Sequence, residues 1–553
     1  MATPSALRSR RRSAGQLHAL AALQREIQAT DPNARRKYLR DFAEAFLNYE
    51  AVVSRAEMQL ELLESDIVLV GDYHALPGSQ RFAAELLESL AHSGRPVVLG
   101  VETIFARHQS ILDEWMHGEI SDDELRERIR FDADWGYEWP PFLGVLQSAR
   151  RNAVGVYGLD CMPRDDLRKI GARDRHAAEK ITEIHERHPR SIVVVLFGES
   201  HLAPNHLPLA MAQRLPNAKV ATVLQNVDPL YWRAAGERHE HVEAVRVRDN
   251  VFCVFNATPL EKYESYRLCI ERWRQERASS VDLAPTLYNL VDALARFLHV
   301  DSHAPHNGTQ PKFLVDMLPE VYYRPTAEGM RKLLARKLGS VPEETLARLE
   351  LQGCCYVPRA NAIFVREFQM VGGAEEAARF LHRSCRGAYT KLQPESADDR
   401  FYGEVIEQAL AYFGSRVLYP ARPAVRESDL YVLYAQPREA IEEHTIYTYR
   451  EYMQMIDFLV MHKDYELHAR HYSVVPDLIA EGIGFTGEKC AFVTSKLGQM
   501  LGSEIYDAYI SGKISKRYLR SLFFRKLEIP SAAHEMYFQL VRRARSPRKR
   551  TVT

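Results

Sequence analysis

The chain has 553 residues, too many for one ordinary hydrophobic core, so two or three domains are expected. Its 73 Lys and Arg balance its 73 Asp and Glu, and this neutrality argues against nucleic acid as a partner, because phosphate binding needs a basic face. No apolar run reaches the length of a membrane span, and the seven cysteines, which form no C-x-x-C pair, fit buried thiols in a reducing compartment.

The first 65 residues divide into a basic segment and a helical one. Residues 1–15 are rich in arginine and predict a disordered basic N-terminus. They lead into a mixed, helix-like stretch instead of the apolar core of a secretory signal, so a cytoplasmic location is expected. Residues 16–65 place apolar side chains at helical spacing and predict N-terminal helices, with a break at Asp31-Pro32-Asn33.

Residues 66–260 alternate between short apolar runs and stretches with helical periodicity. This alternation is typical of βαβ crossovers, and it predicts an α/β fold with a mainly parallel sheet and helices on both faces. The expected strands are 67–70, 97–101, 154–159, 192–197, 220–224 and 251–255.

The strand–helix alternation is lost in the second half of the chain. Residues 275–311 contain proline, glycine and histidine and are expected to form a linker region. Residues 312–540 predict a mostly α-helical C-terminal domain with a short β element at 362–365, and residues 541–553 form a basic tail. We expect the helical domain either to pack over a site of the α/β domain or to mediate assembly, so a homo-oligomer is one open expectation.

Two similar turns, Gly71-Asp72-Tyr73-His74 and Gly198-Glu199-Ser200-His201, each follow an expected buried strand. A single histidine after a strand usually caps the strand or lies on the surface. Two strands that deliver the same acid–histidine pattern are harder to explain by packing, and ligands of open α/β sheets bind at the carboxyl edge. We therefore predict a functional site at this edge.

Two more acids end expected strands, Glu102 the second strand and Asp160 the third. In a parallel sheet both would share the edge with His74 and His201. Two imidazoles with carboxylates are typical ligands of zinc, manganese or iron, so His74, Glu102 and His201 are the candidate metal ligands. The same groups would also serve as an acid–base set without a metal.

Further residues are expected to line the rim of this site. Arg173 and Asp174 open an amphipathic helix after the third strand, where the acid would complement the helix dipole and the arginine would bind a carboxylate or phosphate oxygen. Trp135 and Tyr137 belong to an aromatic stretch that suits either a corner of the core or the wall of an apolar ligand pocket.

These motifs, in this order, resemble the ChaN-like haem-binding-uptake family. That family belongs to the wider Tiki superfamily, which also includes TraB-like and erythromycin-esterase-like proteins. The resemblance covers roughly residues 60–260. It implies an α/β domain with its site at the carboxyl ends of the strands, haem or iron binding for ChaN-like members, and a metal-dependent peptidase for Tiki-type members.

Carried onto this chain, the resemblance points to His74, Glu102 and His201, with Arg173 nearby. Some ChaN-like proteins are expected to bind haem through a tyrosine. Tyr73 is the nearest candidate, although its side chain should alternate away from that of His74 on an extended segment.

Two functions stay open at this point. The first is a haem- or iron-binding protein, with Tyr73, Trp135, Tyr137 and Asp174 around the cofactor and haem or another small molecule as its partner.

The second is a metal-dependent hydrolase. A bound divalent ion of iron, zinc or manganese would activate water. Glu199 or Asp72 would act as the general base, and Arg173 would hold an anionic group of the substrate. A third possibility is a scaffold without catalytic function, in which the polar residues at the sheet edge only cap the strands.

Overall fold

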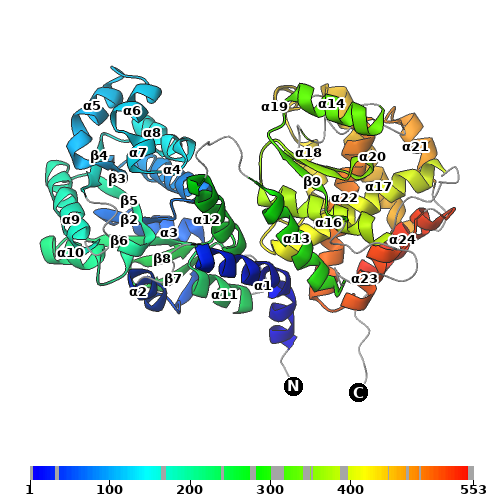
Figure 1. Ribbon diagram of the computed structural model, residues 1–553, viewed down its shortest axis with the longest axis horizontal. Helices are drawn as coiled ribbons and strands as arrows, with labels where there is room; N and C mark the ends of the chain where they lie inside the picture. The colour runs from blue at the N-terminus through cyan, green and yellow to red at the C-terminus, as the bar shows by residue number, and fades with distance from the viewer. Residues whose placement is uncertain are drawn as a thin grey trace. The chain divides into compact units, whose positions relative to one another are not determined.

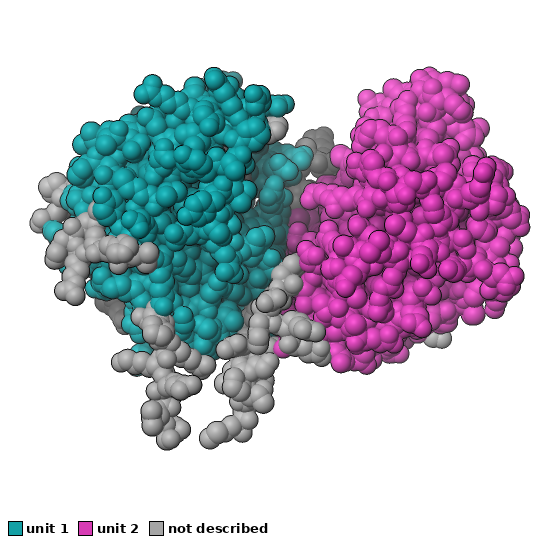
Figure 2. Space-filling model, turned by 180° about the vertical axis from the view of Figure 1, so that it is seen from behind, with its two compact units in different colours: residues 1–22, 280–553 teal, residues 23–279 magenta. Residues whose placement is uncertain are grey.

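The computed structural model describes residues 4–30, 37–162, 170–237, 242–274, 282–300, 317–339, 349, 353–386, 396–445, 447–468, 473–484, 487–527 and 529–545. The chain forms two compact units. We call Leu23–Ser279 the α/β unit, and Met1–Ala22 together with Ser280–Thr553 the helical unit; Figure 2 colours them separately.

The α/β unit contains an eight-stranded sheet with the strand order β1-β7-β8-β6-β2-β5-β3-β4. The strands are β1 (Ala51–Val53), β2 (Ile67–Asp72), β3 (Val97–Phe105), β4 (Val156–Asp160), β5 (Ile192–Gly198), β6 (Val220–Gln225), β7 (Ala244–Arg248) and β8 (Val251–Val254). The six strands predicted from the sequence all form, and they pair in parallel with their neighbours. The two strands not predicted, β1 and β7, make the antiparallel edge, where β1 is only three residues long.

Helices cover both faces of this sheet, as predicted (Figure 1). Within β2, Val68 and Val70 face one core, whereas Ile67 and Leu69 face the other, which explains the continuous apolar run. The helical elements of this unit are α2 (Lys37–Ala45), α3 (Arg55–Leu62), α4 (Pro77–Ala91), η1 (Ala106–His108), α5 (Gln109–His117), α6 (Asp122–Arg128), α7 (Phe131–Asp134), α8 (Trp139–Asn152), α9 (Ile170–Arg187), η3 (Glu199–Leu202), α10 (Leu207–Arg214), α11 (Asp228–Glu237) and α12 (Pro259–Arg274).

The helices that follow the neighbouring strands β2 and β5 pack on opposite faces of the sheet. Helix α4 follows β2 and contributes to one core, and α10 follows β5 and contributes to the other. Connections that diverge in this way open a crevice outside the carboxyl ends of the two strands, which is the usual ligand position in open α/β sheets.

The helical unit has the predicted mostly helical C-terminal region, and the β element predicted at 362–365 forms β11. A small three-stranded sheet has the order β10-β11-β9. The elements of this unit are α13 (Ala284–Leu298), β9 (Glu320–Tyr323), α14 (Ala327–Leu338), β10 (Cys354–Val357), η5 (Pro358–Ala360), β11 (Ala362–Val365), α16 (Met370–Arg386), α17 (Ala397–Leu418), α18 (Ser428–Tyr434), α19 (Arg438–His444), α20 (Tyr449–His468), α21 (Val475–Ala480), α22 (Glu488–Ile510), α23 (Lys516–Phe524) and α24 (Ala532–Arg545).

Two helices extend into the segments predicted from the sequence to form a basic N-terminus and a basic tail. Helix α1 (Pro4–Thr30) already starts within the segment expected to be disordered, where Arg11 donates a hydrogen bond to the Tyr509 carbonyl. Helix α24 runs into the expected tail because Arg545 pairs with acids of the helical unit. Helix α13 lies inside the expected linker, of which residues 275–281 and 301–311 fall outside the described part. None of the helices described is both long and apolar enough to cross a membrane.

Candidate functional site

The predicted turns meet at the carboxyl edge of the sheet, where β2, β5, β3 and β4 are consecutive neighbours. Asp72, the last residue of β2, is in register with Gly198, the last residue of β5. These strands and the first turns of α9 together form one polar cluster, and β3 continues to Phe105, so Glu102 lies within the strand and not at its predicted end. We call this cluster the sheet-edge site; it consists of Asp72, His74, Glu102, Asp160, Arg173, Asp174 and His201.

His74 forms the accessible end of the sheet-edge site. Its Nδ1 lies 2.8 Å from Asp72 Oδ2, and the Gln80 amide donates to the other oxygen of Asp72. Because a carboxylate only accepts, Nδ1 carries a proton, and Nε2 is the ring nitrogen left for a ligand when the ring is neutral. That Nε2 lies 3.7 Å from Glu102 Oε2, and the side chain is 20% exposed.

Glu102 is the buried centre of the site. Its Oε1 accepts from Arg173 Nη2 at 2.5 Å, and its Oε2 accepts from the Gly198 amide at 2.5 Å. Burial opposes ionisation, but the charges of Arg173, His201 and His74 together with the Gly198 N–H lower the pKa of Glu102 to about 2. Glu102 is therefore a permanent anion at neutral pH.

Arg173 is a positioning residue in this structure. Its Nε and Nη2 donate to the two oxygens of Asp160, each at 2.9 Å, while Nη2 also reaches Glu102. The side chain is only 7% exposed, so its hydrogen bonds are made to protein groups in the interior and not to solvent. We predicted that Arg173 holds an anionic group of the substrate. Such a group would have to compete with Asp160 and Glu102, which Arg173 already binds.

A second histidine–carboxylate pair lies on the other side of Glu102. His201 Nδ1 is 2.5 Å from Asp174 Oδ1, and His201 Nε2 is 3.7 Å from Glu102 Oε1. Asp174 also accepts from His206 Nδ1 at 3.0 Å. Burial raises the pKa of Asp174, but the hydrogen bonds from both histidines outweigh it and lower this pKa below its ordinary value. The two Nε2 atoms of His74 and His201 thus approach different oxygens of one buried carboxylate.

The carboxylates outnumber the guanidinium in this cluster. Asp72, Glu102, Asp160 and Asp174 face the single charge of Arg173, and Asp72 and Glu102 are the two carboxylates nearest to His74. Burial lowers the pKa of His74, yet Asp72 and Glu102 outweigh this effect and raise it above its ordinary value.

Aromatic rings form a wall beside His74. The imidazole lies 4.5 Å from the Trp135 ring and 5.2 Å from the Tyr137 ring, measured between centroids. The Trp273 ring continues the wall at 5.3 Å from Tyr137, and 47% of this residue is exposed. The predicted aromatic stretch therefore packs against the core, and two of its rings contact the His74 imidazole.

Glu199 and Tyr73 point away from the two histidines of their own turns. Glu199 pairs with Lys262 of α12, with Nζ–Oε1 at 2.9 Å, and Lys262 Nζ lies 4.6 Å from the centre of the Tyr73 ring. Burial lowers the pKa of Lys262, but Glu199 outweighs this and raises it. The expected alternation of Tyr73 and His74 is present, because Tyr73 packs on Tyr266 while His74 packs on Trp135.

The sequence-based candidates thus fall into two groups. His74, Glu102 and His201 come together with Asp72, Asp160, Arg173 and Asp174, whereas Glu199 and Tyr73 belong to the neighbouring Lys262 pair. Sequence reasoning missed Gln80, His206 and Lys262. The signal for His206 was its place five residues after His201, directly before α10; Lys262 left no such signal, because α12 is distant along the chain.

The prediction that His74, Glu102 and His201 hold a bare metal ion finds no support in this geometry. Within the part of the chain that the structure describes, no three or more His, Cys, Asp or Glu side chains are arranged to hold a metal ion. Both oxygens of Glu102 already accept short hydrogen bonds from protein donors.

Comparison with known proteins gives a match in the same region. Residues 58–173 match the sequence model of the family described as haem-binding uptake, Tiki superfamily, ChaN. A structure of ChaN of Campylobacter jejuni with cofacial haem binding is 16% identical, with a TM-score of 0.25, covering 32% of this chain and 86% of that chain. The type III effector HopBA1 is 15% identical, with a TM-score of 0.27, covering 38% of this chain and 96% of that one.

A search of the curated proteins finds no match to the chain. The family match falls on the region that holds β2, β3 and β4 and ends at Arg173. It confirms the resemblance predicted from the turns: within its α/β unit, this chain resembles the ChaN haem-binding-uptake family of the Tiki superfamily.

Proposed function

We propose that the α/β unit binds haem at the sheet-edge site, with His74 as the iron ligand. The observation that carries this proposal is the arrangement of the His74 imidazole: Asp72 holds Nδ1, so Nε2 is the nitrogen that the neutral ring can offer to iron, and the side chain is 20% exposed. A carboxylate behind a ligand histidine fixes the ring and raises its basicity, as in other metal-binding histidines.

The surroundings of His74 fit a flat apolar cofactor. Trp135 and Tyr137 pack on the imidazole and Trp273 packs on Tyr137, and apolar and aromatic walls with few polar groups are typical of cofactor pockets. The matched family is a haem-binding family, which supports the same ligand. Haem would supply the redox or ligand-binding chemistry, whereas the protein's own groups bind and orient it.

A hydrolase is the second candidate, and one observation favours it. His74 and His201 each have a carboxylate behind Nδ1 and direct Nε2 to Glu102 at 3.7 Å. An imidazole held in this way acts as a general base toward water in many hydrolases. In this candidate His74, the more exposed of the two, would take the proton from water.

A haemin titration of the full chain tests the first proposal. We expect the wild type to shift the Soret band at micromolar protein, and we expect His74→Ala to lose most of that shift. His92→Ala is the matched control, because His92 is exposed at the end of α4, outside the sheet-edge site. A wild-type protein that leaves the haemin spectrum unchanged would overturn the proposal.

Hydrolysis of p-nitrophenyl butyrate by the same variants separates the candidates. Turnover that is lost in both His74→Ala and His201→Ala but kept in His92→Ala would favour the hydrolase. Haem binding without turnover would favour the first proposal.

A further inference from the structure

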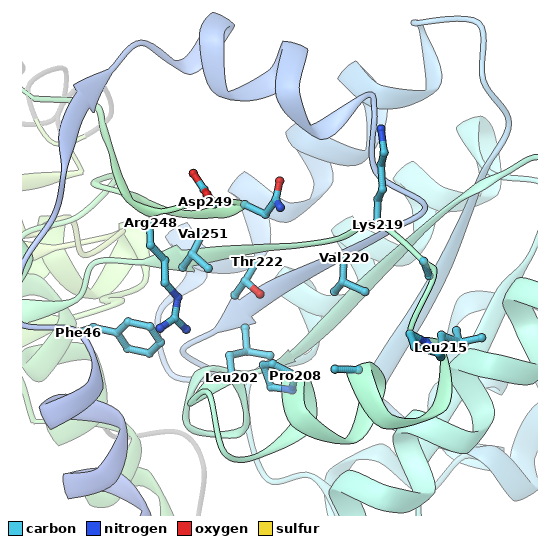
Figure 3. A pocket seen from close by; sticks show the side chains of 14 residues that line it. Phe46, Leu202, Pro208, Leu215, Lys219, Val220, Thr222, Arg248, Asp249 and Val251 are labelled. Carbon is cyan, nitrogen blue, oxygen red and sulfur yellow. The ribbon is translucent and has the colours of Figure 1, made fainter.

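A hollow of the α/β unit shares no residue with the sheet-edge site. It is a cavity of about 440 Å³ between strands β6 and β8 and helix α10, with Phe46 at one end and Leu215 at the other (Figure 3). Its volume falls within the range of small-molecule sites. Nothing in the proposed haem chemistry uses it.

The floor of this cavity is apolar and well buried. Phe46 and Leu202 are each 1% exposed, and Val251 is 8% exposed. Pro208 and Val220 add further apolar surface. This apolar part of the lining favours a hydrocarbon segment of a ligand, because burying apolar surface is favourable, whereas Lys219, Asp249 and Asn250 make the rest of the lining polar.

Thr222 breaks the apolar pattern of the floor. It shares a sheet face with Leu224, and its neighbours in register are Leu69 of β2 on one side and Val251 of β8 on the other. Although only 6% exposed, it lines the cavity, and in Figure 3 its side chain points into it. The hydroxyl supplies one polar contact inside an apolar surface.

A β-bulge directs Arg248 to the same cavity. Arg246 pairs with Phe252, but the next pair is Arg248 with Val251, so β7 holds one extra residue at this point. Residues opposite each other in an antiparallel pair share a face, and a bulge changes the face that the following side chain occupies. Arg248 therefore shares the cavity face with Val251, and Figure 3 shows its guanidinium next to Phe46.

The charge at the cavity is not neutralised. Over the residues described, the Arg248 side chain makes no hydrogen bond or ion pair, in contrast to Arg246, which pairs with Glu61. Lys219 and Asp249 also line the rim, but their side chains point away from the cavity in Figure 3. Among the residues that the structure describes, Arg248 thus has no partner for its charge beside the apolar part of the cavity.

We propose that this cavity binds a small amphiphilic carboxylic acid. The hydrocarbon part fills the space above Phe46 and Leu202, and the carboxylate pairs with the planar guanidinium of Arg248, which presents two parallel donors to such a group. The Thr222 hydroxyl adds one polar contact to the ligand between its hydrocarbon part and its carboxylate. The ligand class follows from three features together: an apolar floor, a volume of about 440 Å³ and one unpaired cation.

Isothermal titration of the full-length protein with decanoate tests this proposal. We expect saturable binding by the wild type and at least about tenfold weaker binding by 1-decanol, which has the same chain without the charge. Arg248→Gln should weaken decanoate binding by about tenfold or more, and Ala212→Trp should abolish it, because Ala212 is an exposed residue that lines the cavity and a large ring there would fill it. Each of these factors corresponds to the loss of one charge-assisted hydrogen-bonded pair.

Arg246→Gln is the matched control, since Arg246 is on the same strand but on the opposite face. It should leave decanoate binding unchanged. The proposal is overturned by a wild type that does not bind decanoate, by decanol that binds as tightly as decanoate, or by Arg248→Gln with unchanged affinity. Haemin titration of Arg248→Gln should match the wild type, which keeps this test separate from the haem proposal.

Discussion

Each unit of this protein contains a histidine paired with a carboxylate, and the two pairs differ in what surrounds them. In the α/β unit, His74 pairs with Asp72 at 2.8 Å and is 20% exposed. In the helical unit, His462 Nδ1 lies 3.5 Å from Glu466 Oε1, and both side chains are fully buried. His462 Nε2 also contacts the Tyr402 hydroxyl at 3.1 Å. One imidazole keeps a nitrogen for a ligand, whereas the other is enclosed by protein groups on both sides.

The carboxylates of the two clusters show why a shifted pKa does not identify a functional site. Burial opposes ionisation of Glu466, but His462 and Lys463 lower its pKa to about 2, the same value as that of Glu102. Lys463 and Arg545 each lie 2.7 Å from Glu466 Oε2. Depressed pKa values arise in structural ion-pair networks as well as in active sites, so the exposure of the imidazole is the feature that distinguishes the clusters.

The largest effect is expected in the helical unit, from Glu466→Ala. This change leaves Lys463, whose side chain is 2% exposed, as a buried charge without its main partner, and breaking such a pair costs about 3–5 kcal/mol. Calorimetric unfolding of the full chain should show the loss. Glu443→Ala, at an exposed position of α19, should stay within about 0.5 kcal/mol of the wild type. A Glu466→Ala variant as stable as this control would contradict the structural role.

Arg173→Lys should have a smaller effect, in the α/β unit. Lysine keeps the charge, but it cannot give the paired hydrogen bonds to Asp160 while also reaching Glu102. We expect about 1–3 kcal/mol less stability in urea unfolding, the range for lost buried hydrogen bonds. Arg175→Lys, exposed on the same helix, is the control. An equal loss in both variants would mean that the buried Arg173 contacts add nothing.

The sequence was sufficient to predict the shared edge, because the argument needed only strand direction. Buried apolar runs before Asp72, Glu102, Asp160 and Glu199 predicted parallel strands, and parallel strands end together. The sequence was not sufficient to predict where side chains point in the turns that follow the strands. Glu199 was expected beside His201, but the 3-10 turn η3 directs its carboxylate to Lys262 instead.

Contacts from distant elements could not be predicted for a related reason. Lys262 and Trp273 belong to α12, whose place beside the edge depends on how that helix packs. Arg248 looks like an ordinary exposed hairpin arginine until the bulge in β7 is known. Periodicity reports which residues share one element, and it carries no information on which elements meet.

The pH dependence of stability gives a third, smaller difference between the clusters. The folded pKa of His74 is raised above 6.5 because Asp72 and Glu102 outweigh burial and Arg173. Protonation of His74 therefore stabilises the fold fully below about pH 6.5, and this contribution is lost as pH rises through the raised pKa. Urea unfolding of the wild type and of Asp72→Asn from pH 6 to pH 9 should show a steeper decline for the wild type. Parallel pH curves would contradict the His74–Asp72 coupling.

Gly198→Ala should have the smallest effect on stability and a larger effect on haemin affinity. An added Cβ would lie 3.0 Å from Glu102 Oε2 and 3.2 Å from His74 Nε2, while the backbone at φ −50° and ψ 131° accepts alanine. We expect a stability loss of about 1 kcal/mol from overpacking. Haemin affinity should fall more than tenfold, since the methyl group occupies the approach to Nε2. Gly144→Ala, with open space around its Cβ position in α8, should leave haemin binding intact.

If Gly198→Ala bound haemin like the wild type, the ligand would not reach the protein through the space between His74 and Glu102. The His74–Asp72 pair of the α/β unit would then be a structural pair, like the enclosed His462–Glu466 pair of the helical unit.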